Sequence, residues 1–328
     1  MTLPPNVPLL EVRDLRVSFS TPDGVLEAVR GISFSVNRGA VLGLVGESGS
    51  GKSVATQSMV GLTRGARVAG QALFEGQDLL AMPPAKLREV RGRGIAMIFQ
   101  NPLSSLHPLY RIGWQIVELI QAHEPVSARQ ARARAIELLG LVGIPRPDRR
   151  VDDYPHQFSG GMLQRSMIAM ALALNPRLLI ADEPTTALDV TVQAQILRLL
   201  RQVQREFGTA IIMITHDLGV VAEMSDHVVV MYAGRAMETA PRRALFQMPA
   251  HPYTRGLFGS LPRWDLQRSR LSPIPGQPPS LIGPPLGCPF QQRCTAAVDR
   301  CRTETPPAYL VGGDANHLSA CWLGGQQT

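Results

Sequence analysis

Short apolar runs alternate along the chain with longer amphipathic stretches, and this pattern predicts an α/β fold. Four of the runs have the length and composition of buried parallel strands, and they cover residues 41–45, 95–99, 178–181 and 210–215. Residues 189–207 carry apolar positions at helical spacing and stop at Gly208, which predicts a long helix. We therefore expect a parallel sheet whose strands are connected by helices.

Two other regions depart from this alternation of strand and helix. The apolar positions from Leu10 to Phe19 keep roughly to every second residue, which predicts an antiparallel strand pair at the start of the chain. From about Pro102 to Asn175 the pattern predicts helices, among them 114–121 and 130–141, and no clear strand. We interpret residues 102–175 as a helical subdomain inserted into the sheet domain.

The composition changes after Ala240. Thirteen of the 27 prolines fall between Pro241 and Pro307, and proline disfavours the interior of helices and strands. We predict that residues 1–240 form the main domain and that residues 241–328 form a separate, small, loop-rich domain.

Chemically active side chains follow the predicted parallel strands at the points where the strands end. Gln100 follows the second strand, Asp182 and Glu183 follow the third, and His216 follows the fourth. Because ligands bind at the carboxyl ends of the strands in open α/β sheets, we expect these side chains to lie close together.

A glycine-rich segment follows the first strand and fits the phosphate-loop pattern G-x-x-x-x-G-K-[ST]. Its backbone N–H groups would close around phosphate oxygens, and the predicted helix over 53–62 would add the positive end of its dipole. Lys52 is expected to reach the β- and γ-phosphates of a nucleoside triphosphate, and Ser53 to place its hydroxyl on the bridging Mg²⁺. The predicted nucleotide-binding residues of this loop are Gly46, Glu47, Ser48, Gly49, Ser50, Gly51, Lys52 and Ser53.

The polar residues at the strand ends suggest hydrolysis of that nucleotide. Asp182 is expected to hold Mg²⁺ opposite Ser53, and Glu183 to orient and deprotonate the attacking water. Gln100 is expected to contact Mg²⁺ and the water and to sense the γ-phosphate. His216 is expected to contact the γ-phosphate, although a single histidine at a strand end is more often simply hydrogen-bonded. Two solvated acids at a strand end are the alternative for Asp182 and Glu183.

Two further features bear on the nucleotide. Phe19 ends the predicted first strand, where it either stacks on the adenine ring or belongs to the core. Ser159, Gly160 and Gly161 begin a predicted helix whose open N–H groups would attract a second phosphate. Because one nucleotide cannot easily use both helix ends, we expect the second one to contact the nucleotide of a partner subunit.

Length and charge restrict the class of protein. The 328 residues are 45% hydrophobic and carry a formal net charge of +7. No apolar run approaches the roughly 18 residues of a membrane span, and the first ten residues lack the features of a signal peptide, so we expect a cytoplasmic protein. The basic residues are spread thinly and are not interleaved with aromatics, so we expect no nucleic-acid partner. The positive charge favours a position near anionic lipid headgroups or is simply solvated.

The motifs together resemble those of an ABC transporter ATPase subunit, in order, over about residues 10–240. They are the phosphate loop, Gln100, Ser159 to Gly161, Leu178 to Pro184, Ala187 to Asp189, and His216. Finer stretches, at 45–53, 99–106, 154–157, 251–254 and 287–290, are similar to the dipeptide/oligopeptide importer branch and extend the resemblance into the tail. Phe158 and Met162 depart from the usual Leu and Gln, and His107 stands where these importers usually have Asn.

The resemblance implies an ABC-type P-loop ATPase domain with a RecA-like core sheet, an antiparallel β subdomain and an inserted helical subdomain. It implies ATP and Mg²⁺ as ligands and adds Asp189 to the nucleotide-binding residues. The implied assembly contains a second, related ATPase subunit in a heterodimer, two transmembrane permease subunits and a substrate-binding protein. The chain would lie peripherally on the cytoplasmic face of the inner (plasma) membrane and drive uptake of dipeptides or oligopeptides.

Two other functions compete with this one. Soluble ABC ATPases of DNA repair or translation usually carry two nucleotide domains or a long coiled-coil insertion, and neither is present here. A module that holds ATP without turnover would tolerate loss of the base or the histidine, whereas Glu183 and His216 are both in place.

All four cysteines of the chain lie in the tail, as Cys288, Cys294, Cys301 and Cys321. A reducing cytoplasm disfavours disulfides, so we expect a metal site that stabilises a small core. The spacing lacks the two closely spaced pairs of structural zinc, which favours a [4Fe-4S] cluster over Zn²⁺ or unligated thiols. The resembling importers with a C-P-F-x-x-R-C tail can carry such a cluster. Replacing Cys294 with Ser should unfold the tail and spare ATP binding at Lys52.

Overall fold

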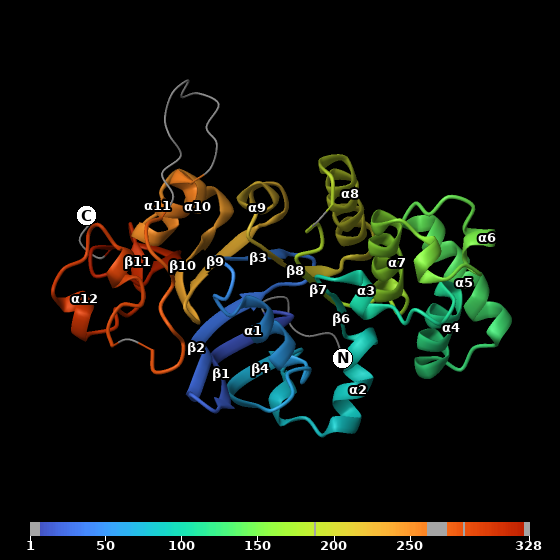
Figure 1. The fold of residues 1–328 in the computed structure, drawn as a ribbon, viewed down its shortest axis with the longest axis horizontal. Helices are drawn as coiled ribbons and strands as arrows, with labels where there is room; N and C mark the ends of the chain where they lie inside the picture. The colour runs from blue at the N-terminus through green and yellow to red at the C-terminus, as the bar shows by residue number, and fades with distance from the viewer. Residues whose placement is uncertain (1–6, 187, 261–273, 285, 325–328) are drawn as a thin grey trace.

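The computed structural model describes residues 7–186, 188–260, 274–284 and 286–324. Its largest element is an eight-stranded sheet in the order β11-β12-β10-β9-β3-β8-β7-β6 (Figure 1). Five neighbouring strands run parallel: β9 (His227–Tyr232), β3 (Val41–Val45), β8 (Ala210–Thr215), β7 (Leu178–Asp182) and β6 (Ile95–Ile98). The four apolar runs are thus confirmed as parallel strands. β3, β7 and β8 are buried on both faces, as is usual for such strands, while Met97 of the edge strand β6 is only partly buried.

A second sheet is antiparallel and has the order β2-β1-β4-β5. It contains β1 (Leu10–Thr21), β2 (Gly24–Val36), β4 (Ala66–Phe74) and β5 (Gln77–Asp78). The predicted opening strand pair is β1 with β2. Side chains of this sheet and of α1 (Lys52–Met59) share one buried apolar cluster with one face of the large sheet.

The chain between β6 and β7 is helical in all its regular elements. It contains α3 (Pro102–Ser105), α4 (Ile112–His123), α5 (Ala128–Leu141), α6 (Pro147–Arg150), the 3₁₀ helix η2 (Pro155–Gln157) and α7 (Gly160–Leu172). These helices gather at the right of Figure 1, beyond the β6 edge of the sheet. The helices expected at 114–121 and 130–141 are therefore confirmed. The subdomain limits at 102 and 175 stay a prediction.

The remaining helices connect or cover strands of the two sheets. They are η1 (Leu79–Ala81), α2 (Pro84–Arg93), α8 (Val190–Phe207), α9 (Leu218–Met224), α10 (Arg242–Gln247), α11 (Pro252–Gly259), η3 (Gln291–Arg293) and α12 (Arg300–Thr303). The expected long helix is α8, which Asp189 caps at its start and which ends at Gly208 in the left-handed conformation. Among the described helices, none has both the length and the apolar character needed to cross a membrane.

The tail is joined to the main sheet by strand pairing. Strand β12 (Asp314–Ser319) pairs with β10 (Arg235–Pro241), and β11 (Tyr309–Val311) pairs with β12. Cys288, Phe290 and Cys301 also belong to the buried cluster that contains Val45 at the end of β3. The proline content correctly indicates loops, but the open edge of β10 supplies backbone hydrogen bonds that join the tail to the main sheet. The boundary at residue 240 remains a prediction.

Candidate functional site

The glycine-rich loop leads from the buried end of β3 into α1. Gly46 and Gly51 have positive φ angles of 151° and 98°, which favour glycine. A Cβ at Gly46 would overlap the carbonyl oxygen of Met231, and one at Gly51 would overlap that of Ala28. Both glycines are therefore required by the close approach of neighbouring backbone.

Lys52 lies inside this loop and is 5% exposed. Its Nζ donates to the carbonyl oxygens of Gly46 and Glu47, both at 2.8 Å, and to Ser50 Oγ at 3.2 Å. Burial lowers the pKa of Lys52, while the charges of Glu183 and Asp182 act in the opposite direction. The ammonium group is thus surrounded by loop oxygens, beside two carboxylates.

Ser53 connects the loop to the end of β7. Its hydroxyl donates to Asp182 Oδ1 at 2.8 Å, and Asp182 is 2% exposed. Burial raises the pKa of Asp182; the hydrogen bond from Ser53 acts against this shift, and the neighbouring charge of Glu183 adds to it. A hydroxyl and a buried carboxylate are oxygen donors of the kind that Mg²⁺ prefers, so these two residues fit the expected ion.

Glu183 is the centre of a cluster at the same edge of the sheet. Its Oε2 accepts 2.9 Å hydrogen bonds from Gln100 Nε2 and Thr186 Oγ1, and its Oε1 lies 3.2 Å from His216 Nδ1. Burial pushes the pKa of Glu183 up, but the hydrogen bonds from Thr186 and His216 outweigh it, and the pKa is lowered. Glu183 also has a φ angle of 47°, a conformation that non-glycine residues adopt at a cost of about 1–3 kcal/mol.

The structure therefore brings together the three polar strand ends that the sequence singled out. The side chain of Glu183 is 14% exposed, whereas that of His216 is 62% exposed and faces solvent. Thr186 was not predicted. Its position three residues after Glu183 indicates a contact only if a turn follows β7. Such a turn is present, because Thr186 N–H donates to the Glu183 carbonyl.

Ser159 caps α7, as predicted, by accepting from Met162 N–H at 3.4 Å. Ser159 and Gly160 are exposed, and Gly161 lies against Val192 in the first turn of α8. Asp189 accepts from Val192 N–H at 2.9 Å. Within the described residues, 159–161 make no hydrogen bond to the phosphate loop. Ala187, which belongs to the same sequence motif as Asp189, lies outside the described residues.

Phe19 is half-buried and packs against the cluster shared by the two sheets. This contact agrees with the core alternative and leaves the adenine contact a prediction.

The four cysteines come from separate segments and line one cavity of about 10 Å³. Cys288, Cys301 and Cys321 are buried, and Cys294 is partly exposed. Burial, with smaller contributions from the other thiols, raises the pKa of Cys288 to about 11. Across the described residues, which include all four thiols, no group of three or more His, Cys, Asp or Glu side chains is arranged to hold a metal ion. The expected cluster is therefore not supported by this arrangement.

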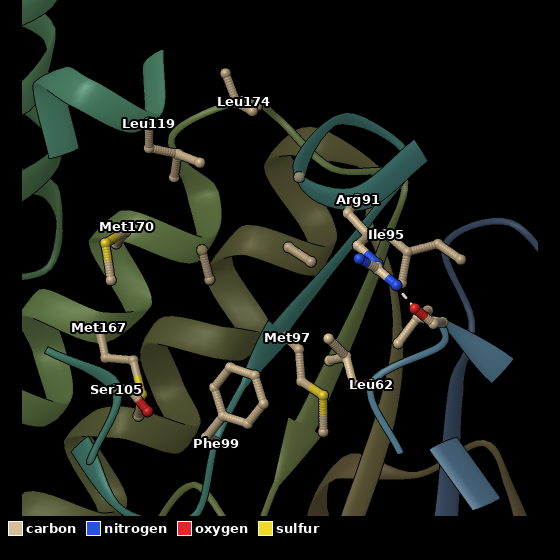
Figure 2. Close-up of a pocket in the computed structure, with 14 residues that line it drawn as sticks. Leu62, Arg91, Ile95, Met97, Phe99, Ser105, Leu119, Met167, Met170 and Leu174 are labelled. Atoms are coloured by element: carbon tan, nitrogen blue, oxygen red, sulfur yellow. Dashed lines mark hydrogen bonds between the residues drawn. The ribbon is translucent and has the colours of Figure 1, made fainter. Parts of the chain in front are cut away.

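A larger apolar cavity of about 260 Å³ lies where β6 faces the helices (Figure 2). Phe99, Met97 and Met170 line it, and Arg91 Nε donates to the Val60 carbonyl at its side. The cavity is distinct from the charged cluster, but Phe99 directly precedes Gln100, which contacts Glu183.

Two protein-family models match the chain. The ABC transporter model covers residues 29–186, and the model for the oligopeptide/dipeptide transporter C-terminal region covers residues 237–301. Curated relatives match nearly the whole length. An oligopeptide transport ATP-binding protein OppD from Haemophilus influenzae is 49% identical over 98% of both chains.

This chain belongs to the ABC transporter family. The dipeptide transport ATP-binding protein DppD of Bacillus subtilis is 48% identical over 97% of this chain and 96% of its own. Among solved structures, the dimeric bacterial ABC transporter cassette MJ0796 is 26% identical, with a TM-score of 0.65 over 71% of this chain and 99% of that chain. The family resemblance and the ABC ATPase fold class are thus confirmed.

Proposed function

We propose that the chain is the ATP-hydrolysing subunit of an ABC importer that takes up peptides, dipeptides or oligopeptides. The observation that carries the proposal is the cluster at the carboxyl edge of the sheet, where Glu183 accepts from Gln100 and lies beside His216. The names of the relatives, which are oligopeptide and dipeptide transport ATP-binding proteins, support the cargo class.

In this proposal the loop 46–53 holds the nucleotide phosphates. Lys52 exchanges its loop oxygens for β- and γ-phosphate oxygens, and Ser53 and Asp182 hold Mg²⁺. Bound Mg²⁺ would neutralise charge that develops on the phosphate oxygens. Phe19 contacts the adenine ring.

Glu183 acts as the general base in hydrolysis. Its lowered pKa keeps the carboxylate ionised, so it can accept a proton from the attacking water. The water oxygen then bonds to the γ-phosphorus, the bond between that phosphorus and the bridging oxygen breaks, and ADP and phosphate leave. Gln100 and His216 hold the carboxylate from two sides. The exposed side chain of His216 would contact the γ-phosphate.

A partner ATPase chain completes the site through Ser159, Gly160 and Gly161. The exposure of Ser159 and Gly160 at the start of α7 and the dimeric form of the related cassette MJ0796 support this step. Asp189 would act at the same seam, since α8 begins beside Gly161. We propose a heterodimer with a related ATPase subunit, two transmembrane permeases and a substrate-binding protein, peripheral on the cytoplasmic face of the inner membrane.

Reconstitution tests the function directly. The chain, its partner ATPase and the permeases would be placed in liposomes, and uptake of a labelled dipeptide and a labelled longer peptide would be followed with binding protein outside and ATP inside. We expect ATP-dependent uptake that Glu183→Gln abolishes while ATP binding persists. Uptake of neither peptide, or uptake insensitive to Glu183→Gln, would refute the proposal.

The cysteines carry a second proposal, a [4Fe-4S] cluster of structural role, with Zn²⁺ as the alternative. The convergence of four thiols on one cavity supports it, and the small size of that cavity and the lack of a metal-holding arrangement speak against it. Elemental analysis of anaerobically purified protein decides the matter. About four irons per chain would establish the cluster, as its composition requires, while stoichiometric zinc or metal-free protein would exclude it.

A further inference from the structure

The tail reaches the phosphate loop through one arginine. Arg293, in η3, forms a bidentate ion pair with Glu47, a loop residue 246 positions earlier in the chain. The distances are 2.7 Å from Nη1 to Oε2 and 3.0 Å from Nη2 to Oε1. The side chain of Arg293 is 6% exposed and that of Glu47 is 27% exposed, so the pair is partly shielded from water. A buried two-pronged pair of this kind fixes orientation as well as distance.

The guanidinium of Arg293 is held by hydrogen bonds from all three of its nitrogens. Besides Glu47 it donates from Nε to Pro275 O at 2.8 Å, from Nη1 to Tyr232 Oη at 3.2 Å and from Nη2 to Ile274 O at 3.3 Å. All five N–H donors of an arginine are thereby used. The hydrogen bonds to Glu47 raise the pKa of Arg293, so the group stays charged.

A second tail residue holds the backbone of the same glutamate. Glu47 N–H donates to Tyr253 Oη at 2.9 Å. Tyr253, in α11, is fully buried, and its ring lies 4.6 Å from that of Tyr232 and 5.3 Å from that of Phe290. The tail therefore fixes Glu47 by its carboxylate and by its amide.

The constraint passes on to the groups that face phosphate. The carbonyl of Glu47 accepts from Lys52 Nζ at 2.8 Å and from Ser50 N–H at 3.2 Å. A shift of Glu47 would move an oxygen that orients Lys52 and would open the turn that places the next amides. A continuous series of hydrogen bonds therefore connects Arg293 and Tyr253 of the tail, through Glu47, to Lys52.

We propose that Arg293, together with Tyr253, is a positioning residue for the phosphate loop, so that the tail sets the conformation in which this loop binds nucleotide phosphate. The inference rests on the proposed function, because it takes the loop 46–53 as the phosphate site. Tail residues also pack in one buried cluster with Val45, the strand residue from which the loop starts. A loop preorganised in this way loses less conformational freedom when it binds its ligand.

The experiment uses the full chain with ADP as the probe. Arg293→Lys keeps the positive charge but cannot form the bidentate pair, and Glu47→Gln keeps the size of the side chain but loses its charge. Arg302→Lys is the matched control, because Arg302 is an exposed arginine of the same tail. Calorimetry gives the ADP affinity, and amide hydrogen exchange gives the protection of the peptide that spans the loop.

We expect both test variants to bind ADP about tenfold more weakly, the size of a lost charged hydrogen bond, and to exchange loop amides faster. The double variant should be no weaker than the worse single one, because both changes remove the same contact. Strand β8 should keep its protection in every variant, which a general loss of stability would not allow. Arg302→Lys should match the original protein.

Unchanged ADP affinity and loop exchange in Arg293→Lys and Glu47→Gln would overturn the inference. If Arg293→Lys fails to fold, Glu47→Gln and Tyr253→Phe carry the same test, since Glu47 is only partly buried and Tyr253→Phe keeps the ring. Lys52→Ala separates the two proposals. If it leaves ADP binding intact, the loop is not the phosphate site; if it abolishes binding while the other variants change nothing, only the positioning role of Arg293 falls.

Discussion

The Ser53 hydroxyl donates a 2.8 Å hydrogen bond to Asp182 Oδ1 and joins the first turn of α1 to the end of β7. The two residues are 129 positions apart, and the carboxylate is buried. The start of the helix and the end of the strand are thus held at the spacing that a shared cation would need.

Asp182→Asn should remove most of the dependence of nucleotide binding on magnesium. The amide keeps an oxygen for Ser53 but lacks the charge that a divalent ion requires, so MgATP should bind about tenfold or more weakly, while Mg-free ATP changes little. Calorimetry with and without Mg²⁺ measures both. Asp226→Asn is the control, because Asp226 accepts from Val41 N–H at the opposite end of β3. Equal losses with and without the ion would contradict the assignment.

Glu183→Gln should separate binding from hydrolysis. Glutamine preserves the hydrogen-bonding size of the side chain and cannot accept the proton of water, so steady-state ATP hydrolysis by the assembled transporter should fall at least about 100-fold. ATP affinity should persist. Glu206→Gln, an exposed change at the far end of α8, should leave the rate unaltered. A normal rate for Glu183→Gln would exclude it as the base.

Ser159→Arg should abolish hydrolysis in the assembly without weakening ADP binding by the isolated chain. Ser159 is exposed at the start of α7, and a bulky charge there would block contact with a partner's nucleotide. ATPase assays of the complex and calorimetry of the single chain provide the two readouts. Loss of ADP affinity in the isolated chain would place Ser159 at its own nucleotide instead, and full ATPase activity of a strictly monomeric chain would remove the need for a partner.

His227 should make the fold sensitive to acid. Burial lowers the pKa of His227 from its ordinary 6.5, partly offset by Asp314. The unfolded chain therefore binds a proton that the folded chain does not, and the stabilising contribution present above pH 6.5 is lost as the pH falls below that value. His227→Gln should show a smaller drop in urea midpoint between pH 7.5 and 5.5. An identical drop would assign the acid sensitivity to other groups.

Local patterns were enough to predict that a glycine-rich loop connects β3 to α1, and to predict the parallel strands. Apolar runs are buried on both faces whatever their neighbours are, and Gly46 and Gly51 are needed for the path of the loop itself. That Gln100, Glu183 and His216 lie close together could be predicted from strand direction, since each follows the carboxyl end of a strand of the same sheet.

Contacts between distant segments could not be predicted in this way. The pairing of β12 with β10 and the ion pair of Arg293 with Glu47 depend on the folded arrangement, and nothing near Arg293 in the sequence indicates a partner 246 residues away. The expectation that Cys294→Ser would unfold the tail and spare ATP binding stays a prediction, and the proposed role of Arg293 argues against its second part. Cys294 directly follows Arg293, so unfolding that turn would also release the loop.

Phe290→Ala tests the packing behind these contacts, because Phe290 lies against Tyr253, which contacts the loop, and Tyr232, which contacts Arg293. Its ring meets that of Tyr232 edge-on at 5.3 Å and lies 5.3 Å from that of Tyr253, and the residue is 3% exposed. Truncation should lower the free energy of unfolding by about 3–5 kcal/mol, as usual for a buried phenylalanine. It should also weaken ADP binding, since Tyr253 and, through Tyr232, Arg293 lose their packing.

Phe246→Ala is the matched control for this change. Phe246 is partly buried and packs against the same cluster, but its ring pairs with that of Phe258, with centroids 4.8 Å apart, rather than with either tyrosine. It should lower stability and leave ADP affinity unchanged. Urea unfolding and calorimetry on both variants decide between two causes. If both variants lose ADP affinity to the same extent, a general loosening of the tail is responsible. If only Phe290→Ala loses ADP affinity, the contacts of Phe290 with the two tyrosines help to position the phosphate loop.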